Sequence, residues 1–237
     1  MNRLIRTIRH DALIPEILRT TPIHVVGVGG VGSHVVELLA RMQLGQPGIT
    51  IYDGDSVETH NPPSQQFTRN HVGMLKVEAL AQQARVWSDD QVSFAVSPQM
   101  VEHKTAFSGI VFLCLDSMQA RRTIFSQSLF SNPDVKLVIE TRMDATLAEV
   151  FLVDPCNAIH EEFWKAYWFP DDKAENSVGC GGHYAIPTAT SMTANLAVQQ
   201  LINYFSEGGQ DTTPNQLMLN LRTWKVTATL WPKEDLT

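Results

Sequence analysis

The chain has 237 residues, of which 43% are hydrophobic and 18% are charged, a balance typical of globular proteins with a sizeable core. Its net charge of -7 gives no general attraction for a polyanion, so neither nucleic acid nor a membrane is expected as a partner. No apolar run approaches the roughly 20 residues of a membrane span, and no secretory segment follows the basic N-terminal residues. Three cysteines without a CxxC pair argue against a disulfide framework and a structural zinc site, and favour a reducing cytoplasm: Cys114, Cys156 and Cys180.

Residues 1–21 predict an N-terminal helical segment, either one helix or two short ones, because apolar residues recur at helical spacing there. From residue 23 onward, short apolar runs alternate with helical patterns, which indicates a doubly wound, parallel α/β sheet. The strands are predicted at 23–28, 49–52, 92–96, 110–115, 137–141 and 149–153, and the helices between them at 35–42, 76–87 and 118–130.

The pattern changes after the sixth strand. Residues 154–187 carry aromatic residues among acids, prolines and glycines, which is typical of a long crossover loop with a short helix. A long helix is predicted over 188–205, and 216–221 with 225–230 predict a closing hairpin. No linker interrupts the chain, so we expect one domain over 1–237, with a Rossmann-like, mostly parallel sheet and a C-terminal antiparallel extension.

A glycine cluster lies between the first predicted strand and the first predicted helix of the sheet, with the sequence Gly27-Val28-Gly29-Gly30-Val31-Gly32-Ser33. Glycines let the backbone turn tightly and approach a phosphate, while the N-terminus of the next helix supplies free N–H groups. Asp53 ends the second strand, where a carboxylate commonly binds a ribose hydroxyl. The pattern predicts a nucleotide site and allows both NAD and ATP.

The polar loop after the second strand favours ATP. Two carboxylates, an amide cluster and a lysine follow the glycine turn, at Asp53, Asp55, Asn61, Gln65, Gln66 and Lys76. An enzyme that handles a triphosphate needs cations and Mg²⁺ near the phosphates, and a dehydrogenase does not. Asp116 ends another buried strand, at the sheet edge where ligands bind in such folds.

In order and spacing, roughly the first half of the chain resembles the ThiF/MoeB/ubiquitin-activating-enzyme-like (HesA/MoeB/ThiF) adenylyltransferase superfamily. The pattern of that family is GxGGxGS, a strand ending in DxD, then Val, Asn, an Arg-Gln pair, Gly and Lys, and later a strand ending in Asp. The chain supplies Gly27, Gly29, Gly30, Gly32, Ser33, Asp53, Asp55, Val57, Asn61, Gln66, Gly73, Lys76 and Asp116.

The resemblance implies roles for these residues around Mg-ATP. Asp53 would hold the ribose, and Lys76 would neutralise the phosphates. Asn61 and Gln66 would line the nucleotide, and Asp116 would hold Mg²⁺.

The resemblance also implies the reaction and its partners. A C-terminal carboxylate attacks the α-phosphate of ATP, and the usual carboxylate belongs to a small ubiquitin-like or sulfur-carrier protein ending in Gly-Gly. Family members are typically homodimers that place an N-terminal arginine in the partner's site. The resemblance implies this role for Arg6 or Arg9.

One departure affects the phosphate site. The Arg-Gln pair of the family reads Gln65-Gln66 here, after one additional residue in Pro62-Pro63-Ser64. Glutamine brings no charge, and losing an arginine that meets transition-state charge normally costs orders of magnitude in rate. Either another arginine substitutes, with Arg69 and Arg142 as further candidates, or the protein binds ATP as a scaffold without efficient chemistry.

Cys180 is the best placed of the three thiols to take over an activated carboxylate as a thioester, because it lies in a glycine-rich stretch just before a helix. A structural cysteine in a glycine turn fits the same pattern. Cys114 is expected in the core, and Cys156 has no evident base. A nicotinamide-dependent oxidoreductase and a branch that activates a tRNA base remain as alternatives.

Overall fold

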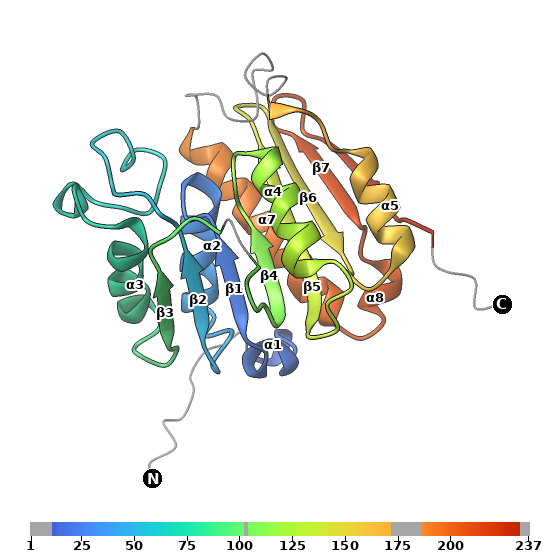
Figure 1. The fold of residues 1–237 in the computed structure, drawn as a ribbon, viewed down its shortest axis with the longest axis horizontal. Helices are drawn as coiled ribbons and strands as arrows, with labels where there is room; N and C mark the ends of the chain where they lie inside the picture. Colours follow the sequence, from blue (N-terminus) through green and yellow to red (C-terminus); the bar gives the residue numbers. More distant parts are fainter. Residues whose placement is uncertain (1–10, 102–103, 172–185, 233–237) are drawn as a thin grey trace, which may run out of the picture.

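A computed structural model describes residues 11–101, 104–171 and 186–232. Within these ranges the strands form one eight-stranded sheet in the order β3-β2-β1-β4-β5-β6-β7-β8 (Figure 1). The five strands from β3 to β5 pair in parallel, and β5 to β8 pair antiparallel. This confirms the expected Rossmann-like, mostly parallel sheet with an antiparallel C-terminal extension.

The strands are short in the parallel half and longer where the sheet becomes antiparallel. Their bounds are β1 Ile23–Val26, β2 Ile49–Tyr52, β3 Phe94–Ser97, β4 Gly109–Leu113, β5 Val135–Met143, β6 Leu147–Val153, β7 Gln216–Asn220 and β8 Lys225–Thr229. Val26 lies beside Tyr52 on one side and Leu113 on the other, so β1, β2 and β4 end level with one another. The residues that follow these three strands therefore share one edge of the sheet.

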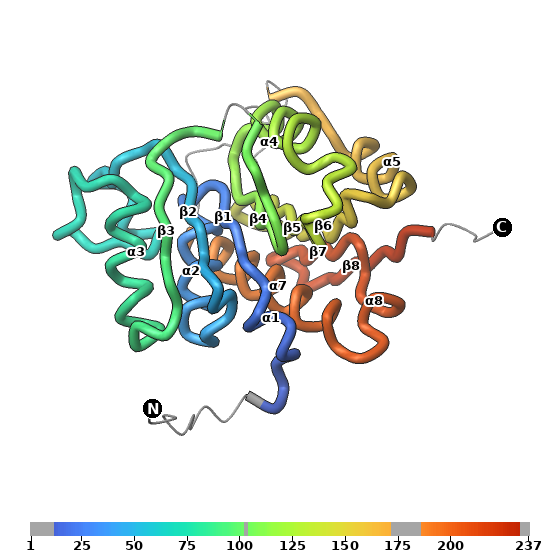
Figure 2. Tube along the Cα trace, turned by 60° about the horizontal axis from the view of Figure 1, so that its bottom comes forward, coloured from blue at the N-terminus to red at the C-terminus, as the bar shows by residue number. Residues whose placement is uncertain are grey.

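Helices cover both faces of the sheet. Their bounds are α1 Ile17–Thr20, α2 Gly30–Arg41, α3 Lys76–Trp87, α4 Met118–Ile124, α5 Ala158–Ala166, α7 Pro187–Phe205 and α8 Gly209–Thr212, with 3-10 turns at Asp11–Leu13 and Arg69–His71. Figure 2 shows α2 and α7 on one side of the strands and α4 and α5 on the other. None of the described helices is both long enough and apolar enough to cross a membrane.

Alternation along the strands divides the core into two layers. Val25 and Ile51 face α2, α3 and α7, whereas Val26, Leu113 and Phe151 face α4 and α5. The apolar runs of the sequence therefore are strands buried on both faces, as their continuity predicts.

Several boundaries differ from the sequence prediction, each for a local reason. β1 ends at Val26 rather than at residue 28, because Gly27 turns the chain with a φ of +83°. The helix expected over 35–42 already begins at Gly30, so the glycine cluster is its first turn. The helix expected over 118–130 changes at Phe125 into a π-helical stretch, Phe125–Leu129.

The outer segments follow the prediction in part. The described part of the N-terminal segment is a 3-10 turn and the four-residue helix α1, and the choice between one helix and two over residues 1–21 stays a prediction. Residues 154–171 contain α5, the short helix expected within the crossover loop. The short helix α8, after Gly208, was not predicted.

A buried carboxylate connects the elements of the second layer. Glu140 on β5 is fully buried and accepts hydrogen bonds from Arg121 on α4, from Arg142 on its own strand and from the indole of Trp164 on α5. Burial by itself raises the pKa of Glu140, but the charges of Arg121 and Arg142 and the hydrogen bonds from Arg142 and Trp164 outweigh it. The pKa is therefore held below its ordinary value, and Glu140 is charged in the folded protein.

We expect Glu140→Gln to lower the free energy of unfolding at neutral pH by about 3–5 kcal/mol, because two buried guanidinium groups lose their counter-charge. The depressed pKa means that this stabilisation is present at neutral pH and is lost as the pH falls through the folded-state pKa. Urea denaturation at pH 7 and at a series of successively lower pH values measures both effects. Glu149→Gln is the matched control, since the half-buried Glu149 accepts a hydrogen bond from Gln216, which an amide oxygen also permits. An equal loss in both variants would contradict the expectation.

Candidate functional site: the glycine turn and the edge of the sheet

The glycine turn joins β1 to α2 under two steric constraints. Gly27 lies in the left-handed region, and a Cβ on Gly32 would lie 1.9 Å from the carbonyl oxygen of Gly27. Gly32 therefore permits α2 to approach β1 closely. A Cβ on Gly29 would meet nothing within 4 Å, and the φ of Gly29 is −74°. The absence of a side chain at Gly29 leaves open space at the start of α2, where a phosphate can approach the backbone.

Asp53 follows β2 and fixes this turn from the side. One carboxylate oxygen of Asp53 accepts from the backbone N–H of Val28 at 2.9 Å, and the other accepts from that of Asp55 at 2.9 Å. Asp53 is only 8% exposed. Each carboxylate oxygen has a second lone pair, so both hydrogen bonds leave Asp53 able to accept from a ribose hydroxyl.

Lys76, the first residue of α3, lies beside the same turn. Its ammonium group makes an ion pair with Asp55 at 2.7 Å, and its side chain is 10% exposed, against 52% for Asp55. Asp53 thus connects the glycine turn, through the backbone of Val28, to Asp55, and Asp55 connects to Lys76. A buried lysine whose partner is an exposed carboxylate can exchange that partner for a phosphate.

The loop between β2 and α3 projects beyond the ends of the strands (cyan in Figure 1). Gln66 connects this loop to α2, because its amide nitrogen lies 2.7 Å from Glu37 and 2.8 Å from the ring of His34. Asn61 is buried and accepts from the backbone N–H of Glu58 at 2.7 Å. Both side chains stabilise the loop, and their expected contact with a nucleotide stays a prediction.

Gln65 has a different environment from Gln66. Its side-chain oxygen is shielded from solvent and accepts no hydrogen bond from the described residues. The loop beside it is held from α7, since the hydroxyl of Thr190 donates to the backbone oxygen of Ser64 at 3.2 Å. Thr190 also packs on the glycine turn, because a Cβ on Gly30 would lie 2.8 Å from its methyl group. Nothing in the sequence pattern singled out Thr190.

Asp116 lies three residues after the end of β4, at the same edge as Gly27 and Asp53. Its side chain is exposed, and no described residue donates a hydrogen bond to it or pairs with it. No group of three or more acidic, cysteine or histidine side chains arranged for a metal occurs among the described residues. Mg²⁺ bound to nucleotide phosphates usually takes only one or two protein carboxylates and keeps several waters, so a single free aspartate fits it.

The described arginines that were considered for the phosphate site lie in different parts of the structure. Arg142 is 5% exposed and is committed to Glu140 and to the backbone oxygen of Tyr167, at 2.8 Å. It is therefore a core residue, and its candidacy as the substitute phosphate arginine was wrong. Arg69 lies exposed in the 3-10 turn of the loop. Arg6 and Arg9 lie outside the described residues.

The described cysteines are poor nucleophiles in this structure. Burial raises the pKa of Cys114 to about 11, so its thiol stays protonated at neutral pH. Cys156 follows β6 at the opposite edge of the sheet, where desolvation and the Asp154 carboxylate raise its pKa. Cys180, the preferred candidate, lies outside the described residues.

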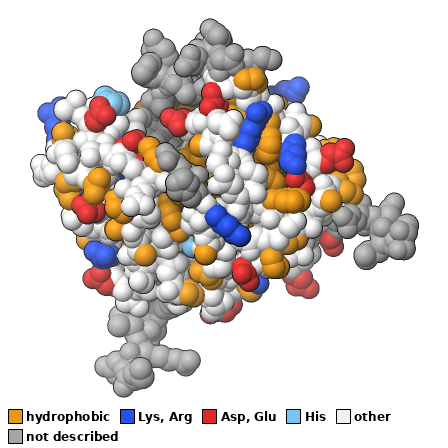
Figure 3. All heavy atoms as spheres, in the orientation of Figure 1, with side chains coloured by type: hydrophobic (Ala, Val, Ile, Leu, Met, Phe, Trp, Pro, Cys, Tyr) orange, Lys and Arg blue, Asp and Glu red, His pale blue; other side chains and the backbone are white. Residues whose placement is uncertain are grey.

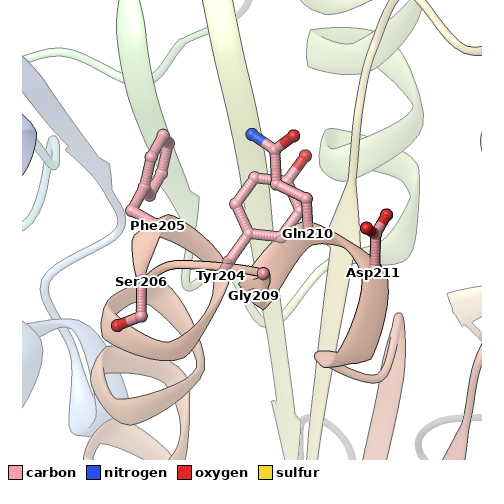
Figure 4. A pocket seen from close by; sticks show the side chains of 7 residues that line it. Tyr204, Phe205, Ser206, Gly209, Gln210 and Asp211 are labelled. Carbon is pink, nitrogen blue, oxygen red and sulfur yellow. The ribbon is translucent and has the colours of Figure 1, made fainter.

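A cavity of about 250 Å³ lies at the C-terminal end of α7, lined by Tyr204, Phe205, Ser206 and residues 208–211 (Figure 4). Fourteen residues of α7 separate Tyr204 from Thr190, a distance of roughly 20 Å along the helix. The cavity is therefore remote from the glycine turn and is not part of the candidate site.

The sheet order, the glycine turn and the carboxylate after β2 define the Rossmann-like class of α/β folds. The model of the ThiF family matches residues 2–234, and the chain belongs to this family.

Two relatives illustrate the similarity. The ubiquitin-like modifier-activating enzyme 5 of Drosophila mojavensis is 36% identical over 215 residues, which cover 82% of this chain and 53% of the relative. The enzyme of the same name from Oryza sativa subsp. japonica is 26% identical over 216 residues, with 82% and 50% covered. The chain thus spans about half the length of these relatives.

Solved structures share the fold. PaaA has a TM-score of 0.70 at 17% identity, covering 94% of this chain and 68% of that one. E. coli MccB solved with ATP has a TM-score of 0.68 at 16% identity, covering 95% and 68%. At these identities the likeness is one of fold.

Two glycine variants separate folding from ligand binding in the turn. We expect Gly32→Ala to lower the free energy of unfolding by roughly 3 kcal/mol, because its methyl group overlaps the Gly27 carbonyl. Gly29→Ala, whose methyl group enters open space, is expected to lose less stability than Gly32→Ala and to weaken ATP binding by blocking the approach of a phosphate. Thermal denaturation and calorimetric titration with Mg-ATP measure the two effects. Unchanged ATP affinity in a folded Gly29→Ala protein would contradict the position given to the phosphate.

Proposed function

We propose that this chain is an ATP-dependent adenylyltransferase, which activates the C-terminal carboxylate of a ubiquitin-like or sulfur-carrier protein or of a peptide. The observation that carries the proposal is the convergence of an open glycine turn, a ribose-type carboxylate, a lysine and a free aspartate on one edge of the sheet. Membership of the ThiF family and similarity to ubiquitin-like modifier-activating enzymes support the class of substrate. The similar fold of MccB, solved with MccA, supports a peptide as an equally suitable carboxylate donor.

In this proposal each residue has one task. The N–H groups at the start of α2, together with Gly27, Gly29, Gly30 and Gly32, hold the phosphates, and Asp53 accepts from the ribose. Lys76 leaves Asp55 and moves onto the phosphates, while Asp55 keeps the lysine near the site before ATP arrives. Asn61, Gln65 and Gln66 shape the wall of the loop around the nucleotide.

The reaction needs positioning and charge compensation more than it needs covalent chemistry. A carboxylate oxygen of the partner attacks the α-phosphorus, the bond from phosphorus to the oxygen that bridges to the β-phosphate breaks, and pyrophosphate leaves. Lys76 meets the negative charge that develops on the transferring and leaving groups. When bound at Asp116, Mg²⁺ neutralises further phosphate charge. The product is an acyl adenylate on the partner.

Three further features belong to the proposal. Arg6 or Arg9 of a second copy completes the site in a homodimer and supplies the charge that Gln65 lacks. A Gly-Gly ending gives the partner's tail the small cross-section needed to reach the α-phosphate. The Cys180 thiolate attacks the acyl carbon of the adenylate, the bond from that carbon to the phosphate oxygen breaks, and AMP leaves as the thioester forms in a cytoplasmic, reducing setting.

A catalytically weakened ATP-binding scaffold is the second candidate, and one observation favours it. Gln65 stands where the family pattern has an arginine, and Arg142 is buried against Glu140 and so unable to replace it. The scaffold binds Mg-ATP through the same residues but exchanges pyrophosphate slowly or not at all.

Calorimetric titration tests the nucleotide site. We expect the wild-type protein to bind ATP in the presence of Mg²⁺ and not to bind NAD. Asp116→Ala should weaken the Mg-dependent binding by more than about tenfold, the lower end of what even an indirect metal partner contributes. Asp134→Ala is the matched control, because Asp134 is an exposed aspartate just before β5, at the opposite edge of the sheet. Binding of NAD instead, or of neither nucleotide, would overturn the proposal.

ATP–pyrophosphate exchange then separates the enzyme from the scaffold. The assay is run with Gly-Gly-ended ubiquitin-like proteins, with the same proteins lacking the two glycines as the control. Exchange that depends on the intact tail supports adenylyl transfer, whereas tight ATP binding without exchange favours the scaffold.

A further inference from the structure

We propose that Asp171 is a positioning residue for Asp116, an inference that rests on the proposed function. Asp171 lies beyond α5 in sequence, yet its carboxylate binds the residues that immediately follow Asp116. The contact connects the segment after α5 to the edge of the sheet where Mg²⁺ and the phosphates are placed.

The contacts of Asp171 converge on three successive residues. One carboxylate oxygen accepts from the hydroxyl of Ser117 at 2.8 Å, and the other accepts from the backbone N–H of Met118 at 2.6 Å. The backbone N–H of Gln119 lies 3.2 Å from the same oxygen. Ser117 in turn accepts from the backbone N–H of Ala120 at 3.0 Å, so the carboxylate and the hydroxyl together satisfy the first turn of α4.

Asp116 is also held from its other side. The guanidinium of Arg121 donates to the backbone oxygen of Leu115 and, through its other nitrogen, to the buried Glu140. The residue before Asp116 is thus bound to the core, and the residues after it are bound to Asp171. Its own carboxylate has no partner among the described residues and stays available for a cation.

Asp171 is itself presented by an ordered segment. Arg142 donates to the backbone oxygen of Tyr167 at 2.8 Å, and Arg122 on α4 stacks over the ring of Trp168, 5.2 Å from the ring centroid. Trp168 also contacts Trp164 and Phe125, edge to face. Contacts of the preceding residues already order the backbone that carries Asp171. Fixing the Asp171 carboxylate therefore costs little additional conformational entropy.

Removal of a residue that only caps a helix lowers the stability and has no other effect. Removal of a positioning residue also changes the affinity for the cation. Asn157 offers the matched comparison, because its side chain caps α5 by accepting from the backbone N–H groups of Ile159 and His160. Both caps stabilise one helix each, but only Asp171 contacts the residues next to Asp116.

The experiment compares Asp171→Ala, Asp171→Asn and Asn157→Ala in the full chain. Calorimetry gives the Mg²⁺ concentration needed for half-maximal ATP binding, and amide hydrogen exchange reports Met118 and Gln119 without ligand. We expect Asp171→Ala to need about tenfold more Mg²⁺, as for other residues that orient a metal ligand, and to exchange faster at both amides. Asp171→Asn, which retains one acceptor oxygen, should recover most of the affinity. Asn157→Ala should lower the Tm without changing either readout.

Unchanged Mg²⁺ dependence in a folded Asp171→Ala protein would overturn the inference, and so would an equal change in Asn157→Ala. If the wild-type protein binds no ATP at any Mg²⁺ concentration, the proposed function fails and the positioning role fails with it. The hydrogen exchange then still shows whether Asp171 holds the first turn of α4, so the two failures are distinguishable.

Discussion

The charge on Glu140 constrains the second layer of this protein more than any other interaction. A carboxylate that loses its water on folding must recover equivalent hydrogen bonds, or its burial costs several kcal/mol. Here the donors come from α4, β5 and α5, and those on the two helices reach Glu140 only when the layer is assembled. The hydrogen bonds that the buried Glu140 carboxylate requires therefore fix the positions of α4 and α5 on the sheet. Arg121, which pairs with Glu140, also donates to the backbone oxygen of Leu115, the residue before Asp116. The ion pair of Glu140 is therefore connected to the candidate site.

On the side of the sheet that carries the glycine turn, close packing of the backbone determines how the elements are arranged, and buried charge does not. Gly32 allows α2 to pack against the turn at Gly27, and Gly30 allows α7 to pack against α2 through Thr190. These contacts pack the start of α2 closely against its neighbours. A rigid set of N–H donors binds an anion with less ordering cost than a flexible loop does. The proposed site thus combines a closely packed helix N-terminus with a lysine that forms an ion pair with Asp55.

Much of this architecture was predictable from the sequence, because local patterns specify it. The apolar runs of β1 and β2 are typical of strands buried on both faces, and α3 begins and ends where its pattern predicts. Asp53 and Asp116 lie at one edge because they follow parallel strands that end level with one another, and Lys76 is joined to this edge through Asp55. The roles of Gln66 and Arg142 were not predictable, since their partners are set by tertiary contacts. Asp171 was missed for the same reason: its partners lie 53 and 54 residues earlier in the chain.

The packing of α7 on the glycine turn has a consequence for the order in which the protein is made. Thr190 binds the loop at Ser64, a residue 126 positions earlier, and its methyl group closes over Gly30. During synthesis the nucleotide half of the sheet therefore leaves the ribosome long before the helix that supports it. Such distant contacts slow folding and leave apolar surface uncovered in the meantime. The face of β1 and α2 that awaits α7 is then the part of the nascent chain most in need of protection by a chaperone.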